Sequence, residues 1–416
     1  MSNDKKPAIR FKDYSDDWEQ RKFSELVTIE RGGSPRPIDK FITKDEDGLN
    51  WVKIGDAPEQ GNYITKTAEK IKPEGLPKTR EVHPGDLILS NSMSFGKPYI
   101  MAIDGCIHDG WLAIRDTNKM FDLKFLCIML GTDNMLSQYK AMAAGSTVNN
   151  LNKELVGGTT VSYPPMEEQV KLGEYFSNLD HLITLHQRKY DKLQNLKKAM
   201  LKKMFPKNGS NVPEIRFKGF TDAWEQRKLG NMMDVTSVKR IHQSDWTDSG
   251  VRFLRARDIV AESKNEEVSE PIFISQEKYD EYSAVSGKVE KGDLLVTGVG
   301  TIGVPMLINS EEPLYFKDGN IIWFKNKNAI DGRFFYHSFK GLNIQKFIKE
   351  SAGTGTVGTY TIENGKKTPI NLPLQKEEQE KIGEYFSNLD NLIALHQREL
   401  EKLKNIKKAM LEKMFV

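Results

Sequence analysis

The chain has 416 residues and a net charge of +3, with 29% charged and 38% hydrophobic residues. These values are typical of a globular protein of two to four domains, and they exclude a disordered chain. The near-neutral total requires no polyanionic partner but permits a basic face, because nucleic-acid affinity follows local Lys and Arg density.

The first segment, residues 1–160, is predicted to be a mixed α/β domain. It lacks an apolar signal segment, and no run of the chain approaches 18 apolar residues, so we expect a cytoplasmic protein. Cys106 and Cys127 lie outside any CxxC or Cys/His pattern, so no disulfide or metal site is expected. Short strands are predicted at 50–54, 86–89, 98–103 and 111–114, and a helix at 122–130.

A long helix is predicted next, within residues 161–207, which also hold a short polar linker. Apolar residues recur at three- and four-residue spacing throughout 167–205, the pattern of a helix that packs against another. Prolines precede its start, where Glu167 and Glu168 suit the positive end of the helix dipole. At ~1.5 Å per residue, the helix is about 58 Å long.

The second segment, residues 208–370, is predicted to repeat the α/β domain, and residues 371–416 to repeat the helix. The run 377–415 is identical to 167–205 at 29 of 39 positions, and Ile215–Leu229 resembles Ile9–Phe23. Strands are predicted at 251–254, 293–297, 304–308 and 320–324, and a helix that ends the domain at 332–350.

The duplicated helices are predicted to pair as coiled-coil-like spacers related by a pseudo-twofold axis. We favour an antiparallel pair, which separates the two globular domains, over a parallel pair, which would place both at one end. The residues expected to pack the helices or their partners are Leu179, Leu182, Leu193, Leu196, Leu389, Leu392, Leu403 and Ile406.

Fainter duplications link the two globular segments. The run 85–96 aligns with 292–303, and Asp109-Gly110 with Asp318-Gly319. Ala144–Val148 likewise resembles 352–357. Small hydroxyl-bearing loops with free backbone amides suit phosphate contact, although ordinary turn chemistry explains each loop equally well.

Side chains that donate or accept hydrogen bonds near these loops are candidates for DNA contact. A solvated surface charge or a local turn bond is the alternative for each one. The candidates in the first domain are Arg31, Arg36, Lys53, Asn91, Ser92, Ser94, Asn149 and Asn150. Those in the second are Arg240, Arg252, Arg255, Arg257, Thr301, Thr356 and Tyr360.

The sequence contains no recognisable catalytic motif. It has no GxxxxGK[ST] phosphate loop, no GxSxG elbow and no HExxH metal motif. Its seven histidines are scattered, and two of them fall on the helical stripe. We therefore expect no catalytic residue, metal or cofactor in this chain.

The whole chain resembles the specificity subunit of a type I restriction-modification system. The resemblance lies in two variable domains, each opened by Trp-Glu-Gln-Arg-Lys at Trp18 or Trp224 and followed by a near-identical long helix. It implies that each domain is a target recognition domain for half of a bipartite, asymmetric double-stranded DNA site. It implies also that the helices set the gap between the halves.

The same resemblance implies partners. Two modification subunits, methyltransferases that use S-adenosylmethionine, would dock on the helices, and restriction subunits would use ATP and Mg²⁺ for translocation and cleavage. A protein–protein scaffold built on paired helices is an alternative function. A stand-alone enzyme is a further alternative, but the absence of a cofactor-binding loop from the sequence argues against it.

Overall fold

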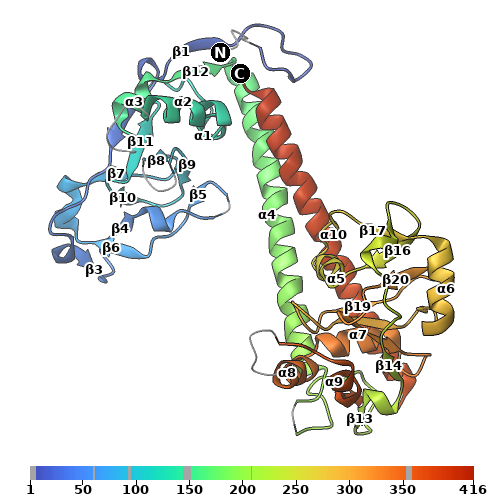
Figure 1. Cartoon of the computed structure of the whole chain (residues 1–416). Helices are drawn as coiled ribbons and strands as arrows, with labels where there is room; N and C mark the ends of the chain where they lie inside the picture. The colour runs from blue at the N-terminus through green and yellow to red at the C-terminus, as the bar shows by residue number, and fades with distance from the viewer. Residues whose placement is uncertain (1–5, 60, 92–94, 144–150, 208, 353–357) are drawn as a thin grey trace. The chain divides into compact units, whose positions relative to one another are not determined.

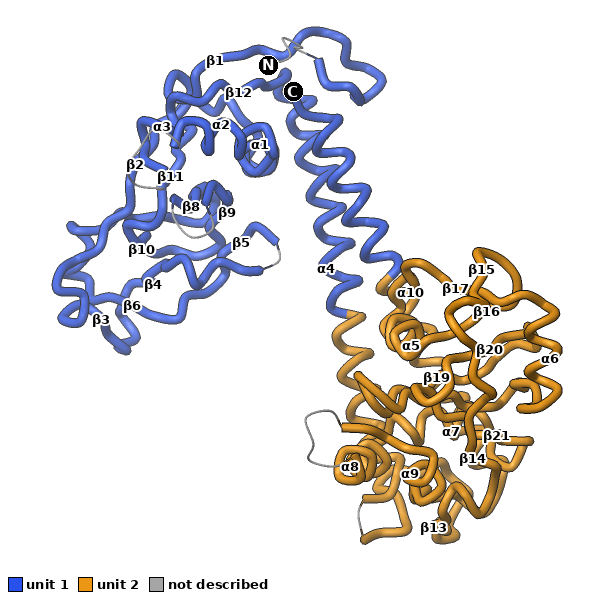
Figure 2. The backbone as a smooth tube through the Cα atoms, viewed as in Figure 1, with its two compact units in different colours: residues 1–188, 398–416 blue, residues 189–397 orange. Residues whose placement is uncertain are grey.

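The computed structural model describes residues 6–59, 61–91, 95–143, 151–207, 209–352 and 358–416. It forms two compact units (Figure 2): unit 1 joins Met1–Arg188 to Arg398–Val416, and unit 2 is Lys189–Gln397. Both long helices cross the boundary between the units, so each unit includes the beginning of one helix and the end of the other. No helix of the described residues is long and apolar enough to cross a membrane.

In the described part of unit 1, the strands form one two-stranded and two five-stranded sheets, ordered β1-β12, β3-β6-β4-β10-β7 and β2-β11-β8-β9-β5 (Figure 1). The strands are β1 (Glu19–Lys22), β2 (Thr28–Arg31), β3 (Ile42–Thr43), β4 (Leu49–Val52), β5 (Tyr63–Ile64), β6 (Glu69–Ile71), β7 (Arg80–Val82), β8 (Leu87–Ser90), β9 (Pro98–Met101), β10 (Gly105–Ile107), β11 (Trp111–Arg115) and β12 (Thr160–Tyr163). The helices are α1 (Leu123–Leu130), α2 (Asp133–Ala143), α3 (Lys153–Gly158) and α4 (Met166–Lys203).

The central strands of unit 1 are apolar on both faces because each face is covered. Along β8, Leu87 and Leu89 belong to the cluster that contains α1, whereas Ile88 belongs to a second cluster with residues of the other five-stranded sheet. Strand β11 divides in the same way, with Leu112 in the first cluster and Trp111 in the second. Burial on both faces explains why these strands read as continuous hydrophobic runs.

In the described part of unit 2, the sheet orders are β13-β22, β14-β21-β18-β19 and β15-β17-β16-β20. The strands are β13 (Glu225–Lys228), β14 (Asp234–Thr236), β15 (Trp246–Thr247), β16 (Val251–Leu254), β17 (Ile272–Ile274), β18 (Leu294–Thr297), β19 (Pro305–Leu307), β20 (Leu314–Phe316), β21 (Ile321–Lys325) and β22 (Pro369–Leu372). The helices are α5 (Ala256–Ser263), α6 (Gln276–Ser286), α7 (Gly332–Lys340), α8 (Leu342–Ser351), α9 (Ile362–Lys367) and α10 (Lys376–Met414).

Each predicted strand is present to within a few residues, but the predicted helix at 332–350 is wrong as a single element. It is interrupted at Gly341, which lies between α7 and α8 in an extended conformation with ψ of 155°. The apolar periodicity continues across the break, so the pattern alone does not reveal it. Helices α2, α3, α5, α6 and α9 were not predicted.

Helices α4 and α10 are antiparallel, as the contacts within each unit show. In unit 1, Asp180 of α4 accepts from Lys407 of α10 at 2.5 Å, and Phe176 lies beside Phe415. Contacts nearer the N-terminus of α4 are therefore made with residues nearer the C-terminus of α10. In unit 2, Lys197 of α4 forms the matching ion pair with Asp390 of α10.

The structure bears out only part of the predicted packing stripe. Leu179 and Leu389 are buried, and Leu193, Leu403 and Ile406 are half-buried against the cores. Three positions are exposed within this chain, namely Leu182, Leu196 and Leu392, and their contact with partners stays a prediction. An α-helix drifts from a strict seven-residue repeat, and the buried residue beside Leu392 is Ile393.

The repeated sequence is explained by contacts that occur once in each unit. The fully buried Glu168 accepts two hydrogen bonds from Arg10, at 2.7 and 2.8 Å, and the buried Glu378 accepts two from Arg216, at 2.6 and 2.7 Å. A buried carboxylate is costly without such a partner. Arg10 and Arg216, at equivalent positions of the duplicated segments 9–23 and 215–229, therefore fix the start of the following long helix.

The end of each long helix completes the core of the unit that it enters. In unit 1, the Phe415 ring lies 6.0 Å from Trp18 and 5.6 Å from Phe125. In unit 2, Phe205 lies 6.0 Å from Trp224 and 5.6 Å from Phe334. The tryptophans of the duplicated opening motifs are thus buried because they receive these helix ends.

Candidate nucleic-acid interface

The duplicated loops of unit 1 meet at one place. At the end of β8, the Asn91 amide donates to the Gly110 carbonyl at 2.9 Å, and the Asn91 side chain donates to the Asp109 carbonyl at 2.9 Å. The Leu151 amide, which follows the third loop, donates to the Asn91 carbonyl at 3.0 Å. Three segments far apart in the sequence therefore form one loop junction.

Unit 2 has the same junction. The Gly298 amide donates to the Asn320 carbonyl at 2.7 Å, and the Tyr360 amide donates to the Gly298 carbonyl at 2.8 Å. A Cβ atom at position 298 would lie 2.7 Å from the Tyr360 carbonyl oxygen, so this close approach requires glycine. The faint sequence alignment between the two domains thus corresponds to a shared structural feature.

Charged and polar side chains surround the Asp109 turn of unit 1. The Ser34 hydroxyl donates to Asp109 Oδ1 at 2.8 Å, and His108 Nε2 lies 2.8 Å from the same oxygen. Arg36 is largely exposed, 4.0 Å from Asp109 Oδ2, while Arg31 donates to the Asp109 carbonyl at 3.4 Å. Burial alone would raise the pKa of Asp109, but the Ser34 hydrogen bond and the charges of His108 and Arg31 outweigh it and lower the pKa.

An exposed arginine lies at the corresponding turn of unit 2. Arg240 Nε donates to Asp318 Oδ2 at 2.8 Å. The other carboxylate oxygen, Asp318 Oδ1, is buried and has no hydrogen-bond partner among the described residues. The aspartate of the duplicated Asp-Gly pair is therefore retained in both units, while its surroundings differ.

Two further candidates, Lys53 and Arg255, occupy matching positions beside these turns. Each follows a strand that is parallel to the strand before the Asp-Gly turn: β4 beside β10, and β16 beside β20. Each begins a helical turn whose third residue, Asp56 or Asp258, accepts from the candidate's own amide at 2.8 Å. The structure thus brings these two residues to the edges of the candidate interfaces.

The candidates differ in how free their side chains are. Lys53 is paired with Glu69, and Arg255 is held by Asp258 and by the Glu270 carbonyl. Arg257 is exposed but forms ion pairs with Asp258 and Glu270. Thr301 is exposed, whereas Arg252 stacks over Phe273. Ser92, Ser94, Asn149, Asn150 and Thr356 lie outside the described residues.

Two candidates lie in the interior, and the surface position expected for them is wrong. Asn91 is 3% exposed and uses its side-chain amide to join two loops. Tyr360 is 2% exposed, and its hydroxyl bonds to the Thr368 hydroxyl. Neither side chain reaches a DNA groove from this position, so both have structural roles.

The residues that sequence reasoning missed are Ser34, His108 and the two turn aspartates. The duplicated Asp-Gly pair was a usable signal, because it marked both aspartates as belonging to equivalent turns. Ser34 and His108 carried no such signal, since serine and histidine are common in turns and their contacts with Asp109 depend on tertiary folding.

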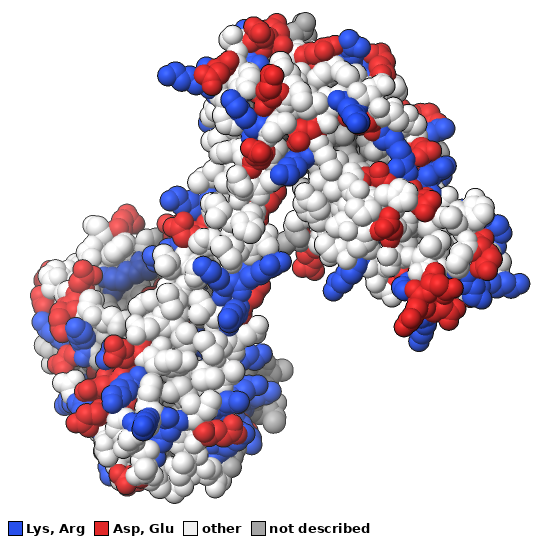
Figure 3. All heavy atoms as spheres, turned by 180° about the vertical axis from the view of Figure 1, so that it is seen from behind, with Lys and Arg blue, Asp and Glu red and all other residues white. Residues whose placement is uncertain are grey.

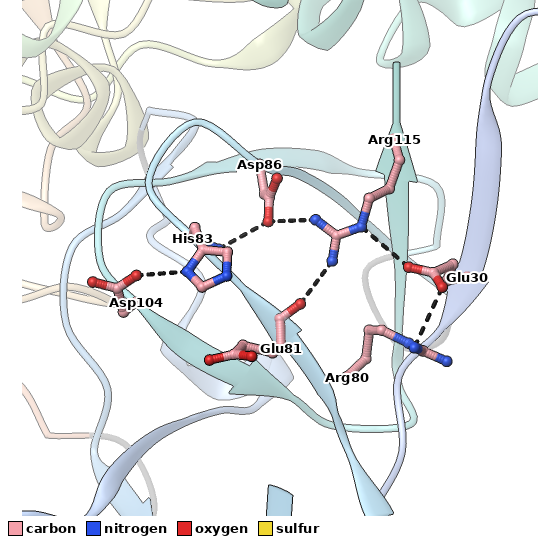
Figure 4. Close-up of polar contacts among 7 residues, drawn as sticks. All are labelled: Glu30, Arg80, Glu81, His83, Asp86, Asp104 and Arg115. Atoms are coloured by element: carbon pink, nitrogen blue, oxygen red, sulfur yellow. Dashed lines mark hydrogen bonds and ion pairs between the residues drawn. The ribbon is translucent and has the colours of Figure 1, made fainter. Parts of the chain in front are cut away.

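A separate group of charged residues in unit 1 joins its two five-stranded sheets (Figure 4). Arg115 of β11 donates to Asp86 at 2.6 Å, to Glu30 of β2 at 3.1 Å and to the Glu81 carbonyl of β7 at 2.7 Å. Arg80 of β7 pairs with Glu30 at 3.3 Å. Each Arg115 bond is used to hold backbone or carboxylate groups of this unit, so we assign the cluster a structural role.

Acidic and basic side chains are interspersed over both units on the face drawn in Figure 3. This agrees with the small net charge and gives no large single-sign surface on that face. The described residues contain no group of three or more potential metal ligands.

The long helices expose matching pairs of leucines. Leu182 and Leu185 of α4 are 41% and 38% exposed, and Leu392 and Leu395 of α10 are 44% and 52% exposed. Residues three apart lie on one helix face. Apolar side chains grouped on an exposed face are typical of a protein interface.

Comparison with known proteins gives consistent results. Residues 15–195 and 221–405 match the family model described as the type I restriction modification DNA specificity domain. The chain is 25% identical over 351 residues to the Type I restriction enzyme MjaVIII specificity subunit of Methanocaldococcus jannaschii, covering 79% of this chain and 78% of that protein. It is 22% identical over 436 residues to the Putative type I restriction enzyme MjaX specificity subunit of the same organism, covering 95% and 92%. The solved S subunit of a type I restriction-modification system from M. genitalium has the same fold, with a TM-score of 0.67 and 16% identity over 99% of both chains.

Proposed function

The chain belongs to the family of type I restriction-modification DNA specificity proteins, and from this premise we propose which parts of it read DNA and which bind partners. It is the specificity subunit of such a system, with two recognition domains. In our proposal, the loop junction of unit 1 reads one half of a bipartite DNA site and that of unit 2 reads the other.

The observation that carries this proposal is the shared junction with unlike side chains. Both units join three loops by the same backbone bonds around an Asp-Gly turn. The turn is lined by Ser34, His108 and two arginines in unit 1, but by Arg240 in unit 2. One framework with two sets of hydrogen-bonding groups suits a DNA site whose halves differ in sequence.

The antiparallel helices would set the distance between the two halves. The ion pairs Asp180–Lys407 and Lys197–Asp390 support this role, because they fix the register of the helix pair in each unit. Lengthening both helices between these pairs by four residues adds ~6 Å, which corresponds to about two base pairs of unread DNA. An unchanged gap in the methylated site would refute the spacer role.

The exposed leucine pairs would receive two modification subunits, one on each helix. Those subunits would bind S-adenosylmethionine and extrude the target adenine, and restriction subunits would use ATP and Mg²⁺. In this proposal the specificity subunit performs no catalytic step itself. Its duplicated helix faces account for two equivalent docking sites.

A domain exchange in the full-length chain tests the division of labour. Residues 24–160 are replaced by the corresponding segment of another specificity subunit, and the chain is co-expressed with its modification subunits. Methylated adenines are then mapped on genomic DNA. We expect a new sequence in one half of the site, with the other half and the gap unchanged.

The reciprocal exchange of residues 230–367 is the matched control and should change only the other half. A change in both halves, or in neither, would contradict separate readers. A wild-type complex that binds its partners but shows no sequence preference would favour a protein–protein scaffold. Methylation by the isolated chain would contradict a purely recognising subunit.

A further inference from the structure

The two units place different side chains at one equivalent position. Thr28 pairs with Arg115 in unit 1, and Asp234 pairs with Lys325 in unit 2, at corresponding points of β2–β11 and β14–β21. Six residues further along each chain come Ser34 and Arg240, and each donates to the carboxylate of its Asp-Gly turn at 2.8 Å. A short hydroxyl in unit 1 is thus replaced by a long guanidinium in unit 2.

We propose that Arg240, oriented by Asp318, recognises a guanine in the half-site that unit 2 reads. This inference rests on the proposed function, since it assumes that the loop junction of unit 2 faces DNA. It assigns Arg240 as a specificity-determining residue and Asp318 as its positioning residue.

The geometry of the Arg240–Asp318 pair leaves the terminal Nη groups of Arg240 available to contact a base. Its side chain is 68% exposed, whereas that of Asp318 is only 12% exposed. The Nε bond to Asp318 restricts the plane of the guanidinium. Within the described ranges, neither terminal Nη group of Arg240 forms a hydrogen bond, and Asp318 is the ion-pair partner of this side chain.

The free Nη groups match guanine, whose O6 and N7 atoms accept two hydrogen bonds from one arginine in the major groove. Adenine, cytosine and thymine do not present two acceptors in this arrangement. Because Asp318 already restrains the side chain, less rotamer freedom is lost when the base is bound.

The charge of the pair favours a base over a phosphate. Asp318 offsets the positive charge of Arg240, so the pair attracts a phosphate less than a free arginine does. A carboxylate beside a phosphate would also be repelled. A base edge carries no net charge, so its recognition depends on the direction of the donors and is not weakened in this way.

Arg240→Lys separates these two possibilities, because lysine keeps the charge but lacks the planar two-donor fork. The full-length chain, in complex with its modification subunits, is tested on duplexes with randomised half-sites. For both Arg240→Ala and Arg240→Lys, we expect the preference for guanine at one position of the unit 2 half-site to fall by about 10- to 100-fold. The other half-site should be read as before.

Asp318→Asn tests the positioning role, since it keeps the size of the side chain and removes its charge. We expect a smaller loss of preference at the same position and no additional loss when it is combined with Arg240→Ala. Arg227→Ala is the matched control: Arg227 is 51% exposed and paired with a carboxylate, but it lies on β13, in the two-stranded sheet of unit 2. It should leave every position unchanged.

Two results would overturn the inference while leaving the proposed function intact. One is an Arg240→Ala complex with wild-type preference at every position. The other is a uniform loss of affinity across all sequences that Arg240→Lys restores, which identifies a phosphate contact. A wild-type complex without any sequence preference would instead refute the proposed function itself.

Discussion

Gly173 of α4 lies against the first residues of α1, and Gly173→Ala probes this close approach. A Cβ atom at position 173 would be 2.5 Å from Asp122 Oδ1 and 3.1 Å from the Phe125 amide nitrogen. These two atoms form the hydrogen bond, 2.9 Å long, that caps the N-terminus of α1. The added methyl group would therefore displace the cap.

Two opposing effects decide the sign of the change. Alanine is favoured over glycine inside a helix by about 1 kcal/mol. Loss of the Asp122 cap costs about 1 kcal/mol, and forcing a methyl group into a packed contact costs roughly 1–3 kcal/mol more. The sum predicts that Gly173→Ala lowers the free energy of unfolding by about 1–3 kcal/mol, although helix propensity alone predicts an increase.

Chemical denaturation of the full-length chain measures this difference, and hydrogen exchange locates it in α1. Gly383→Ala should lower the stability of unit 2 in the same way, since its Cβ would lie 2.6 Å from Asp331 Oδ1. Asn178→Ala is the control, because Asn178 is exposed on the same helix and should become slightly more stable, by about 0.5 kcal/mol. If Gly173→Ala were as stable as wild type or more stable, the reasoning would be wrong.

Two further changes test how the units are held together and how they respond to acid. Phe415→Ala should destabilise unit 1 by about 3–5 kcal/mol, and Phe205→Ala should destabilise unit 2. Hydrogen exchange measures the stability of each unit separately. Equal effects of one variant on both units would contradict this prediction. His337 is 1% exposed, and burial, assisted by nearby Lys197, lowers its pKa to about 2. Because the unfolded histidine titrates near ~6.5, the stability due to neutral His337 is present above that pH and falls by about 1.4 kcal/mol per unit below it. His337→Ile, which copies Ile128 at the equivalent position of α1 in unit 1, should reduce the loss of unfolding free energy between pH 6.5 and 5.5 by about 1 kcal/mol. An equal loss in both proteins would contradict this.

The sequence alone was sufficient for the repeated architecture, because that information is local. Apolar spacing over 39 residues identifies a helix wherever its partner lies, and near-identical copies imply equivalent packing. The β-rich runs and the duplicated Asp-Gly turns were recognisable for the same reason. These features depend on periodicity and turn chemistry within short segments.

Tertiary structure decided which side chains are available for recognition. Asn91 and Tyr360 look like polar surface residues in the sequence, yet both are buried. Leu392 lies on the predicted stripe but is exposed. Burial depends on which distant segment covers a residue, and no local pattern records that.

The helix ends show the same division most clearly. The repeat predicts that Phe205 and Phe415 are equivalent, but not that each fills an aromatic cavity beside the tryptophan of an opening motif. That placement requires Phe415 to meet Trp18 across 397 residues of sequence and Phe205 to meet Phe334 across 129, and it follows from the burial of large aromatic surfaces. The sequence determined the repeated elements of this protein, and long-range packing determined which of their side chains are buried and which face solvent.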